Sequence, residues 1–191
     1  VRNVTSMKYM FKNATSFNQP LNAWDVGQVT TLFGMFDGCS AFNQPLSAWN
    51  VSNVVDMSAL FLNASVFNQP LNTWQTLQVR FMASMFENAF TFNQPLGNWD
   101  VQQVTDMTAM FRKAISFNQP INCWKVDNVC LMDSVFEDCS VFDQALDAWN
   151  VHQVTSMNRL FRNALSFNQC IDGWDVSNVC HMISIFENAR A

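Results

Sequence analysis

The chain repeats every 25 residues, without a single insertion or deletion over its 191 residues. The tryptophans mark this period, at Trp24, Trp49, Trp74, Trp99, Trp124, Trp149 and Trp174. A Phe-Asn-Gln triplet begins seven residues before six of them, and Phe142-Asp143-Gln144 is the one variant. Such a period is typical of solenoids, in which each repeat buries its apolar face against its neighbours. We therefore expect one domain over residues 1–191, with seven complete repeats over 1–175 and a partial eighth over 176–191.

The repeat over residues 21–45 carries the patterns of two kinds of secondary structure. Trp24 and Val26 alternate with polar residues, which predicts a short strand. Apolar residues over 32–39 recur at i, i+3, i+4 and i+7, which predicts a short helical segment. Pro45 cannot continue a helix, so it predicts a corner. The predicted fold is an α/β repeat solenoid with one short parallel strand and one short helical segment per repeat, stacked about 4.8 Å apart.

Composition narrows the classes of partner. Hydrophobic residues make up 49% of the chain, enough for a continuous core, whereas charged residues make up only 13%. The net charge of −5 argues against a nucleic-acid partner, because phosphate binding needs a clustered basic face. No run of 18 apolar residues occurs, so we expect no membrane span.

Two known repeat types resemble this one. Residues 29–39 look like the helical half of a BspA-like leucine-rich repeat, and residues 46–54 look like its strand half, with Trp49 in a usual Ile or Leu position. The pattern Phe-Asn-Gln-Pro-Leu-Asn-x-Trp-Asp-Val-x-x-Val-Thr-x-Met more closely resembles a bacterial surface repeat of about 25 residues, known as a domain of unknown function. The resemblance implies a right-handed solenoid displayed outside the cell or on its surface. It implies adhesion or contact with a protein or surface glycan, and it brings no catalytic residues.

The ends of the predicted stack suggest an alternative function. A solenoid needs polar caps to keep its ends soluble, and no cap is recognisable here. We therefore expect a longer parent protein, or a structural or assembly subunit whose uncapped ends stack on neighbouring repeats or on another chain.

The repeat geometry disfavours disulfides and metal clusters. Cys130 and Cys180 share a repeat position but lie two repeats, about 10 Å, apart, whereas a disulfide needs Cα atoms within about 7 Å. We interpret the six cysteines as small buried thiols. No Cys-x-x-Cys pair occurs, and Asp25, Asp100 and Asp175 lie about 15 Å apart, too far to share a cation. We expect no metal and no cofactor.

Nothing in the repeat predicts a catalytic site. His152 and His181 are the only histidines, and no Ser, Cys or carboxylate has a repeat-defined reason to meet either one. Since nucleophilic catalysis needs a positioned nucleophile and base, we expect a protein that is not an enzyme.

The candidate binding surface is the open face of the predicted sheet. Its outward positions vary from repeat to repeat while the inward ones stay fixed, which is how solenoids encode recognition, although an unconstrained solvent face would vary too. The position after each tryptophan is occupied by Asp25, Asn50, Gln75, Asp100, Lys125, Asn150 and Asp175. From the position two residues further on, the candidates are Gln102, Asp127 and His152.

Three other positions form ladders that we interpret as structural. The residue after the second Phe alternates between basic or neutral and acidic, as Lys12, Asp37, Leu62, Glu87, Arg112, Glu137, Arg162 and Glu187. Amides recur from Gln19 to Gln169 and from Gln28 to Asn178, where stacked copies can satisfy the hydrogen bonds of one another and of the corner backbone.

Overall fold

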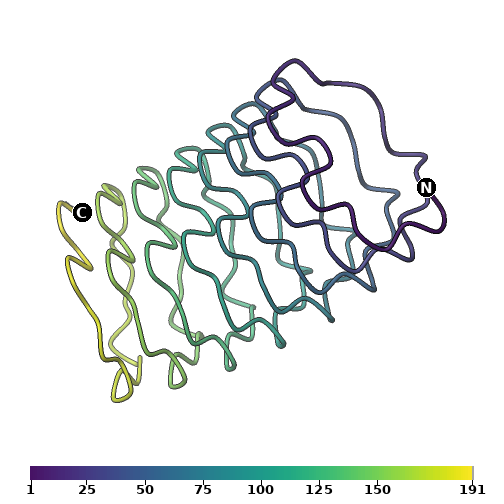
Figure 1. Cartoon of the computed structure of the whole chain (residues 1–191). Coiled ribbons are helices and arrows are strands. Elements are labelled where there is room, and N and C mark those ends of the chain that lie inside the picture. Colours follow the sequence, from purple (N-terminus) through teal and green to yellow (C-terminus); the bar gives the residue numbers. More distant parts are fainter. Residues whose placement is uncertain (191) are drawn as a thin grey trace.

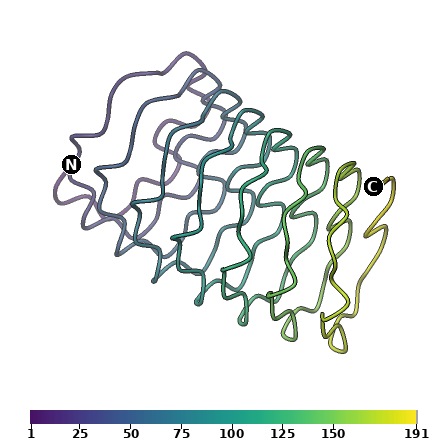
Figure 2. The same ribbon diagram turned by 180° about the vertical axis from the view of Figure 1, so that it is seen from behind.

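The computed structural model, which describes residues 1–190, is a stack of chain coils with the two termini at opposite ends (Figures 1 and 2). Each coil is one 25-residue repeat, and we number repeat positions so that residues 1, 26 and 51 occupy position 1. Parallel one-residue bridges join position 6 of each coil to position 6 of the next, through Ser6, Thr31, Asp56, Phe81, Asp106, Leu131, Ser156 and His181.

The prediction of an α/β solenoid is wrong. Residues 1–190 contain no α-helix and no strand longer than these isolated bridges; turns and irregular segments make up the coils. The segment 32–39, predicted to be helical, is a run of turns. The strand predicted at Trp24 and Val26 is also absent, and the bridge lies further along the chain, at Thr31.

Left-handed backbone at repeat positions 9 and 13 prevents a helix. Fourteen non-glycine residues at these positions have φ between 54° and 61°, and Gly34 and Gly38 have φ of 58° and 76°. A positive φ suits residue i+2 of a type II turn. The matching i+3 bonds are present, from Met35 N to Leu32 O and from Cys39 N to Phe36 O, both 3.0 Å. The chain therefore turns every four residues instead of winding into a helix.

The same segment binds each coil to the next through its backbone. N–H groups at positions 7, 9, 11 and 13 donate to carbonyls of the following coil, as Leu32 does to Asp56 (2.9 Å) and Phe36 does to Leu60 (3.0 Å). N–H groups at positions 10, 12 and 14 donate within their own coil. Inter-coil and intra-coil bonds thus alternate along this segment, which we call the ladder segment (positions 5–13).

The core consists of aromatic columns that run along the stack. The Phe column at position 11 has ring centroids 5.6–5.9 Å apart, the Phe column at position 17 has 5.9–6.1 Å, and the column from Trp49 to Trp174 has 6.3–6.5 Å. From Trp49 onward each indole Nε1 donates to a carbonyl of the preceding coil, as Trp74 does to Leu46 O at 3.0 Å. An Ile or Leu at this position could not make that bond, which gives the tryptophan a structural role beyond packing.

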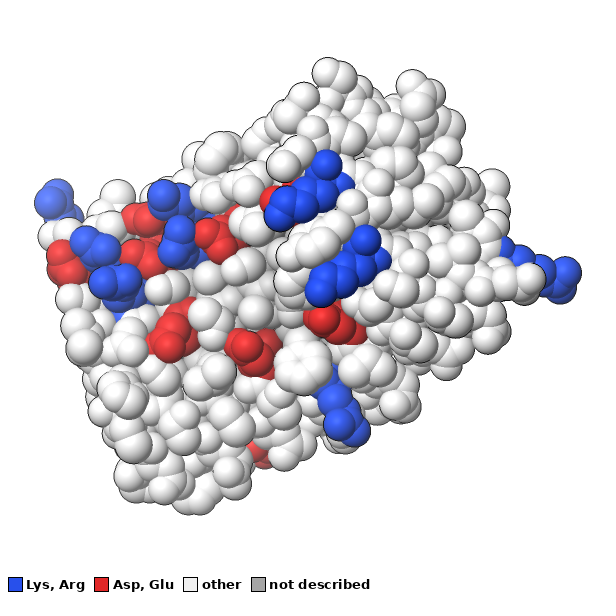
Figure 3. Space-filling view, in the orientation of Figure 1, with Lys and Arg blue, Asp and Glu red and all other residues white. Residues whose placement is uncertain are grey.

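The predicted charge ladder is confirmed in most coils. Lys12 pairs with Asp37 at 2.8 Å and Arg112 with Glu87 at 2.9 Å, while Arg162 lies 3.2 Å from both Glu137 and Glu187. Figure 3 accordingly shows acidic and basic side chains intermingled, not segregated. The hydrogen bond and charge of Asp37 raise the pKa of Lys12.

The amide ladder of positions 18 and 19 is also confirmed. Gln69 Nε2 and Asn68 N both donate to Asn43 Oδ1, at 3.0 and 2.9 Å, and the pattern recurs along the stack. The second ladder, at position 3, works differently: its asparagines donate to backbone carbonyls, as Asn53 does to Gly27 at 2.7 Å. The second ladder thus satisfies the backbone, as predicted, but not through contacts between its own amides.

Candidate interaction surfaces

The predicted binding residues lie on one exposed strip, which we call the polar face. It consists of position 25 of one repeat and positions 2, 3 and 5 of the next. Along the chain, these positions alternate with the buried tryptophans at position 24 and the buried valines at positions 1 and 4. Position 25 is exposed at Asp25, Asn50, Gln75, Lys125, Asn150 and Asp175, and half-buried at Asp100. At position 2, Gln102, Asp127 and His152 are exposed.

Most side chains at position 25 form a hydrogen bond with the backbone of the turn that follows them. Asp25, Asn50, Asp100, Asn150 and Asp175 each accept the N–H of the residue two further on, at 3.0–3.3 Å. Asp and Asn favour this turn, in which the side chain stands in for a backbone acceptor. Five of the seven predicted contact residues at this position therefore have a structural role, and Gln75 and Lys125 do not share it.

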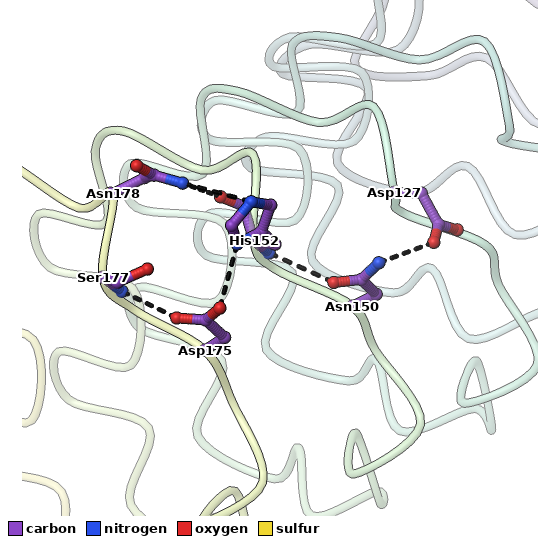
Figure 4. A network of polar contacts seen from close by, with 6 residues as sticks. All are labelled: Asp127, Asn150, His152, Asp175, Ser177 and Asn178. Atoms are coloured by element: carbon purple, nitrogen blue, oxygen red, sulfur yellow. Dashed lines mark hydrogen bonds and ion pairs between the residues drawn. The ribbon is translucent and has the colours of Figure 1, made fainter.

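A network of polar contacts occupies the C-terminal part of the polar face (Figure 4). His152 Nδ1 lies 2.9 Å from Asp175 Oδ2, and Asn150 Nδ2 donates to Asp127 Oδ1 at 2.8 Å. In both pairs, the residue at position 2 contacts the residue at position 25 that lies 23 residues further along the chain. Stacking of the coils makes these two positions diagonal neighbours. The prediction that no carboxylate would meet His152 is therefore wrong.

Asp175 is held as a carboxylate by this network. The hydroxyl and the N–H of Ser177, together with His152, lower the pKa of Asp175 to about 2. The other ring nitrogen of His152 lies 3.4 Å from the amide of Asn178, which is not a nucleophile. The arrangement can orient an imidazole, and within residues 1–190 it places no Ser, Thr or Cys side chain within hydrogen-bond reach of that ring.

The middle of the polar face differs from its two ends. Leu77 is an exposed apolar side chain, and the side chains of Arg80, Gln102 and Lys125 make no hydrogen bond or ion pair with residues 1–190. Two shallow hollows lie beside them. One is lined by Asp100, Gln102 and Lys125 among others, and the second by Arg80, Gln103 and Gln153 among others.

A second surface was not predicted from the sequence. Five consecutive coils each expose one large apolar side chain at position 15 or 16, and we call this set the apolar row: Val66, Phe90, Ile115, Val141 and Leu165. Each is 42–46% exposed, whereas equivalent residues in the first two coils are Thr15, Ser16, Ser40 and Ala41. The signal in the sequence was this change from small or hydroxylated residues to large apolar ones.

The cysteines are only partly as predicted. All six are free thiols, but only Cys39 and Cys139 are buried, while Cys123, Cys170 and Cys180 are exposed. Burial raises the pKa of the Cys39 thiol to about 11 and raises that of Cys139 further. Residues 1–190 bring no three His, Cys, Asp or Glu side chains together in a group that could hold a metal ion. They also contain no helix long and apolar enough to cross a membrane.

These features define a repeat protein made of stacked, turn-rich coils with two exposed surfaces along the stack. The model of a family described as Mycoplasma protein of unknown function, DUF285, matches residues 1–99 and again residues 81–191. The chain therefore belongs to this family. No curated protein matches the chain. The family match supports the predicted repeat domain and does not extend to the BspA-like name.

Proposed function

We propose that the chain is a non-enzymatic protein-interaction module whose partner docks on the apolar row. The carrying observation is that five successive coils each expose a large apolar side chain at one of the two adjacent positions 15 and 16. Scattered apolar residues are ordinary on protein surfaces, whereas a contiguous row is typical of a binding site.

The fold does not require these apolar side chains. At position 15 or 16, four hydroxyls donate to a carbonyl of the preceding coil, those of Ser40 (to Thr15, 3.3 Å), Ser65, Thr91 and Ser166 (to Ser140, 2.8 Å). Phe90, Ile115 and Leu165 cannot make that bond. In the coils of Phe90 and Leu165 the adjacent Thr91 and Ser166 make it instead, whereas the coil of Ile115 has no such hydroxyl bond among residues 1–190. Every member of the row exposes apolar surface to water, which a bound partner would offset.

The spacing of the row favours a helical partner. The neighbouring Phe column at position 17 repeats at 5.9–6.1 Å, so successive side chains of the row lie about one coil spacing apart. An α-helix presents one apolar side chain per 5.4 Å turn, close to this spacing. We infer that an amphipathic helix of a partner protein lies along the row, with one apolar residue for each coil.

The middle of the polar face is the alternative contact surface on the same module. This part of the surface exposes the apolar Leu77 and the side chains of Arg80 and Lys125, which have no hydrogen-bond or ion-pair partner among residues 1–190 and are therefore free to contact a partner. The resemblance to BspA-like repeats supports display of the module outside the cell, where it would serve adhesion.

Paired variants test the proposal. The wild-type chain, Ile115→Asp and Leu77→Asp are each immobilised and exposed to the same mixture of extracellular proteins, and captured proteins are quantified by mass spectrometry. Both substitutions replace an exposed side chain, at 45% and 51% exposure, so neither should change the melting temperature appreciably. We expect a captured protein to bind Ile115→Asp at least tenfold more weakly, about 1.4 kcal/mol, and Leu77→Asp normally.

The opposite pattern, with loss confined to Leu77→Asp, would move the contact to the polar face and refute the apolar row. Equal capture by all three proteins would refute both surfaces. A captured partner that lacks an amphipathic helix would refute the helical mode of docking.

A further inference from the structure

One of the two hollows on the polar face spans four consecutive coils, and we call it the Arg80 hollow. Its volume is about 410 Å³, and it is lined by Arg80, Gln103, Thr105, Asn128, Cys130 and Gln153. Each of these coils is bridged to a neighbouring coil on both sides, so the lining groups belong to the interior of the stack. The volume lies within the range of about 300–1,000 Å³ that is typical of small-ligand sites.

Arg80 supplies this hollow with a positive charge that the fold does not use. At the same repeat position, the hydroxyls of Thr30 and Thr155 donate to a carbonyl of the preceding coil, at 3.1 and 3.2 Å. Arg80 keeps the backbone bonds of this position, but its guanidinium makes no hydrogen bond or ion pair with residues 1–190. A guanidinium with free N–H donors can bind a carboxylate through two parallel hydrogen bonds.

Two free amides lie in the coils before and after that of Asn128. Asn128 itself donates to Gln102 O at 2.7 Å, so it serves the backbone. Gln103 and Gln153 occupy the same repeat position as Asn128, and neither side chain makes a hydrogen bond within residues 1–190. Each of these amides offers both a donor and an acceptor, and the acceptor is satisfied only by a ligand group that donates.

These groups together select one class of ligand. A simple carboxylate would satisfy the guanidinium, but it only accepts hydrogen bonds and would leave the amide oxygens unpaired. A neutral sugar would pair with the amides and leave the guanidinium without a counter-charge. A sugar that bears a carboxylate has both the anion and the hydroxyls, which donate as well as accept.

We propose that the Arg80 hollow binds an acidic sugar, with Arg80 on its carboxylate and with Gln103 and Gln153 on its hydroxyls. The hollow uses repeat positions 3 and 5, whereas the apolar row uses positions 15 and 16. Sugar binding is therefore independent of the protein docking proposed for the apolar row. Because the hollow is shallow and leaves much of a ligand in water, the dissociation constant for a single sugar is on the order of 1 mM.

An NMR titration of the full 191-residue chain with D-glucuronate tests the proposal. D-Glucose, which has ring hydroxyls without the carboxylate, and propionate, which has a carboxylate without hydroxyls, are the matched ligands. Arg80→Gln removes the charge from the hollow. Lys113→Gln is the matched control variant, because Lys113 is an exposed cation at position 13, outside the hollow. Circular dichroism checks that both variants are folded.

Glucuronate should shift the side-chain amide signals of Gln103 and Gln153 and the Nε–H signal of Arg80. It should bind about fivefold more tightly than glucose or propionate, because each of these lacks one set of hydrogen bonds. Arg80→Gln should bind glucuronate about tenfold more weakly than the wild-type chain and no better than glucose, whereas Lys113→Gln should bind it normally.

Two larger ligands separate the sources of the carboxylate. Tighter binding of a galacturonic acid tetrasaccharide than of glucuronate would support an acidic polysaccharide as the ligand, and equal binding would support a free sugar acid. Tighter binding of a glutamate hexapeptide than of the tetrasaccharide would overturn the proposal in favour of an acidic peptide. Equal affinities for glucuronate and propionate, absence of the three signal shifts, or an unchanged glucuronate affinity in Arg80→Gln would also refute it.

Discussion

Replacing Trp99 by phenylalanine should destabilise the stack through a defined set of contacts. Trp99 is buried, its Nε1 donates to Leu71 O at 2.9 Å, and its ring lies between Trp74 and Trp124 at centroid distances of 6.3 and 6.5 Å. Phenylalanine keeps an aromatic ring in the column but loses the indole N–H and two ring carbons. The variant therefore probes the hydrogen bond together with a small change in packing.

The magnitude follows from these losses. The Leu71 carbonyl still accepts the N–H of Trp74, so the missing bond leaves it half satisfied and costs about 0.5–1.5 kcal/mol. Two buried carbons at about 0.8 kcal/mol each add about 1.6 kcal/mol. We expect Trp99→Phe to lower the free energy of unfolding by about 2–3 kcal/mol.

Trp24 provides the matched control within the same chain. It occupies the same repeat position in the first coil, is only half-buried, and its indole N–H has no acceptor among residues 1–190. Trp24→Phe should cost less than about 1 kcal/mol, because it removes no hydrogen bond and little buried surface. Urea denaturation followed by circular dichroism and by fluorescence measures both variants, and coincidence of the two probes checks for cooperative unfolding. Equal costs for the two variants would refute the role given to the indole bond.

Two further predictions concern titratable groups. The pKa of about 2 at Asp175 favours the folded state above about pH 4, and this contribution should disappear as pH falls toward 2; carboxyl NMR should show a midpoint near 2 that rises in Ser177→Ala. An unchanged midpoint in that variant would contradict the assigned cause. Cys39 and Cys139 should resist a thiol reagent until the chain unfolds, because burial raises their pKa values, while the three exposed cysteines react in the native chain. Labelling of Cys139 at the rate of the exposed thiols would contradict the core packing.

The burial pattern was predictable from the repeat, and the secondary structure was not. Positions that keep Trp, Val or Phe in every repeat are the buried positions, because each must pack against its own copy in the next coil. The charge alternation and the amides at positions 18 and 19 were predictable for the same reason. The prediction of a helix was wrong because apolar residues at i, i+3, i+4 and i+7 also suit a chain that turns every four residues. Asn, Gly or Asp at position 13 in seven of eight repeats was the missed signal, since these residues tolerate a left-handed backbone.

The binding surface was harder to predict, because a repeat position can be polar for two different reasons. Asp and Asn at position 25 vary in the manner of a recognition surface, yet all five of them accept a backbone N–H two residues on. Variation between Asp and Asn preserves that bond, so it carries no information about a partner. Substitutions that abolish an internal contact are more informative. Lys125 cannot accept the backbone N–H that Asp100 accepts at the same repeat position. Ile115 cannot donate the inter-coil hydrogen bond that the Ser40 hydroxyl donates. A substitution that removes an internal hydrogen bond at an exposed position does not stabilise the fold. Contact with a partner is then the physical reason to expect such a residue there.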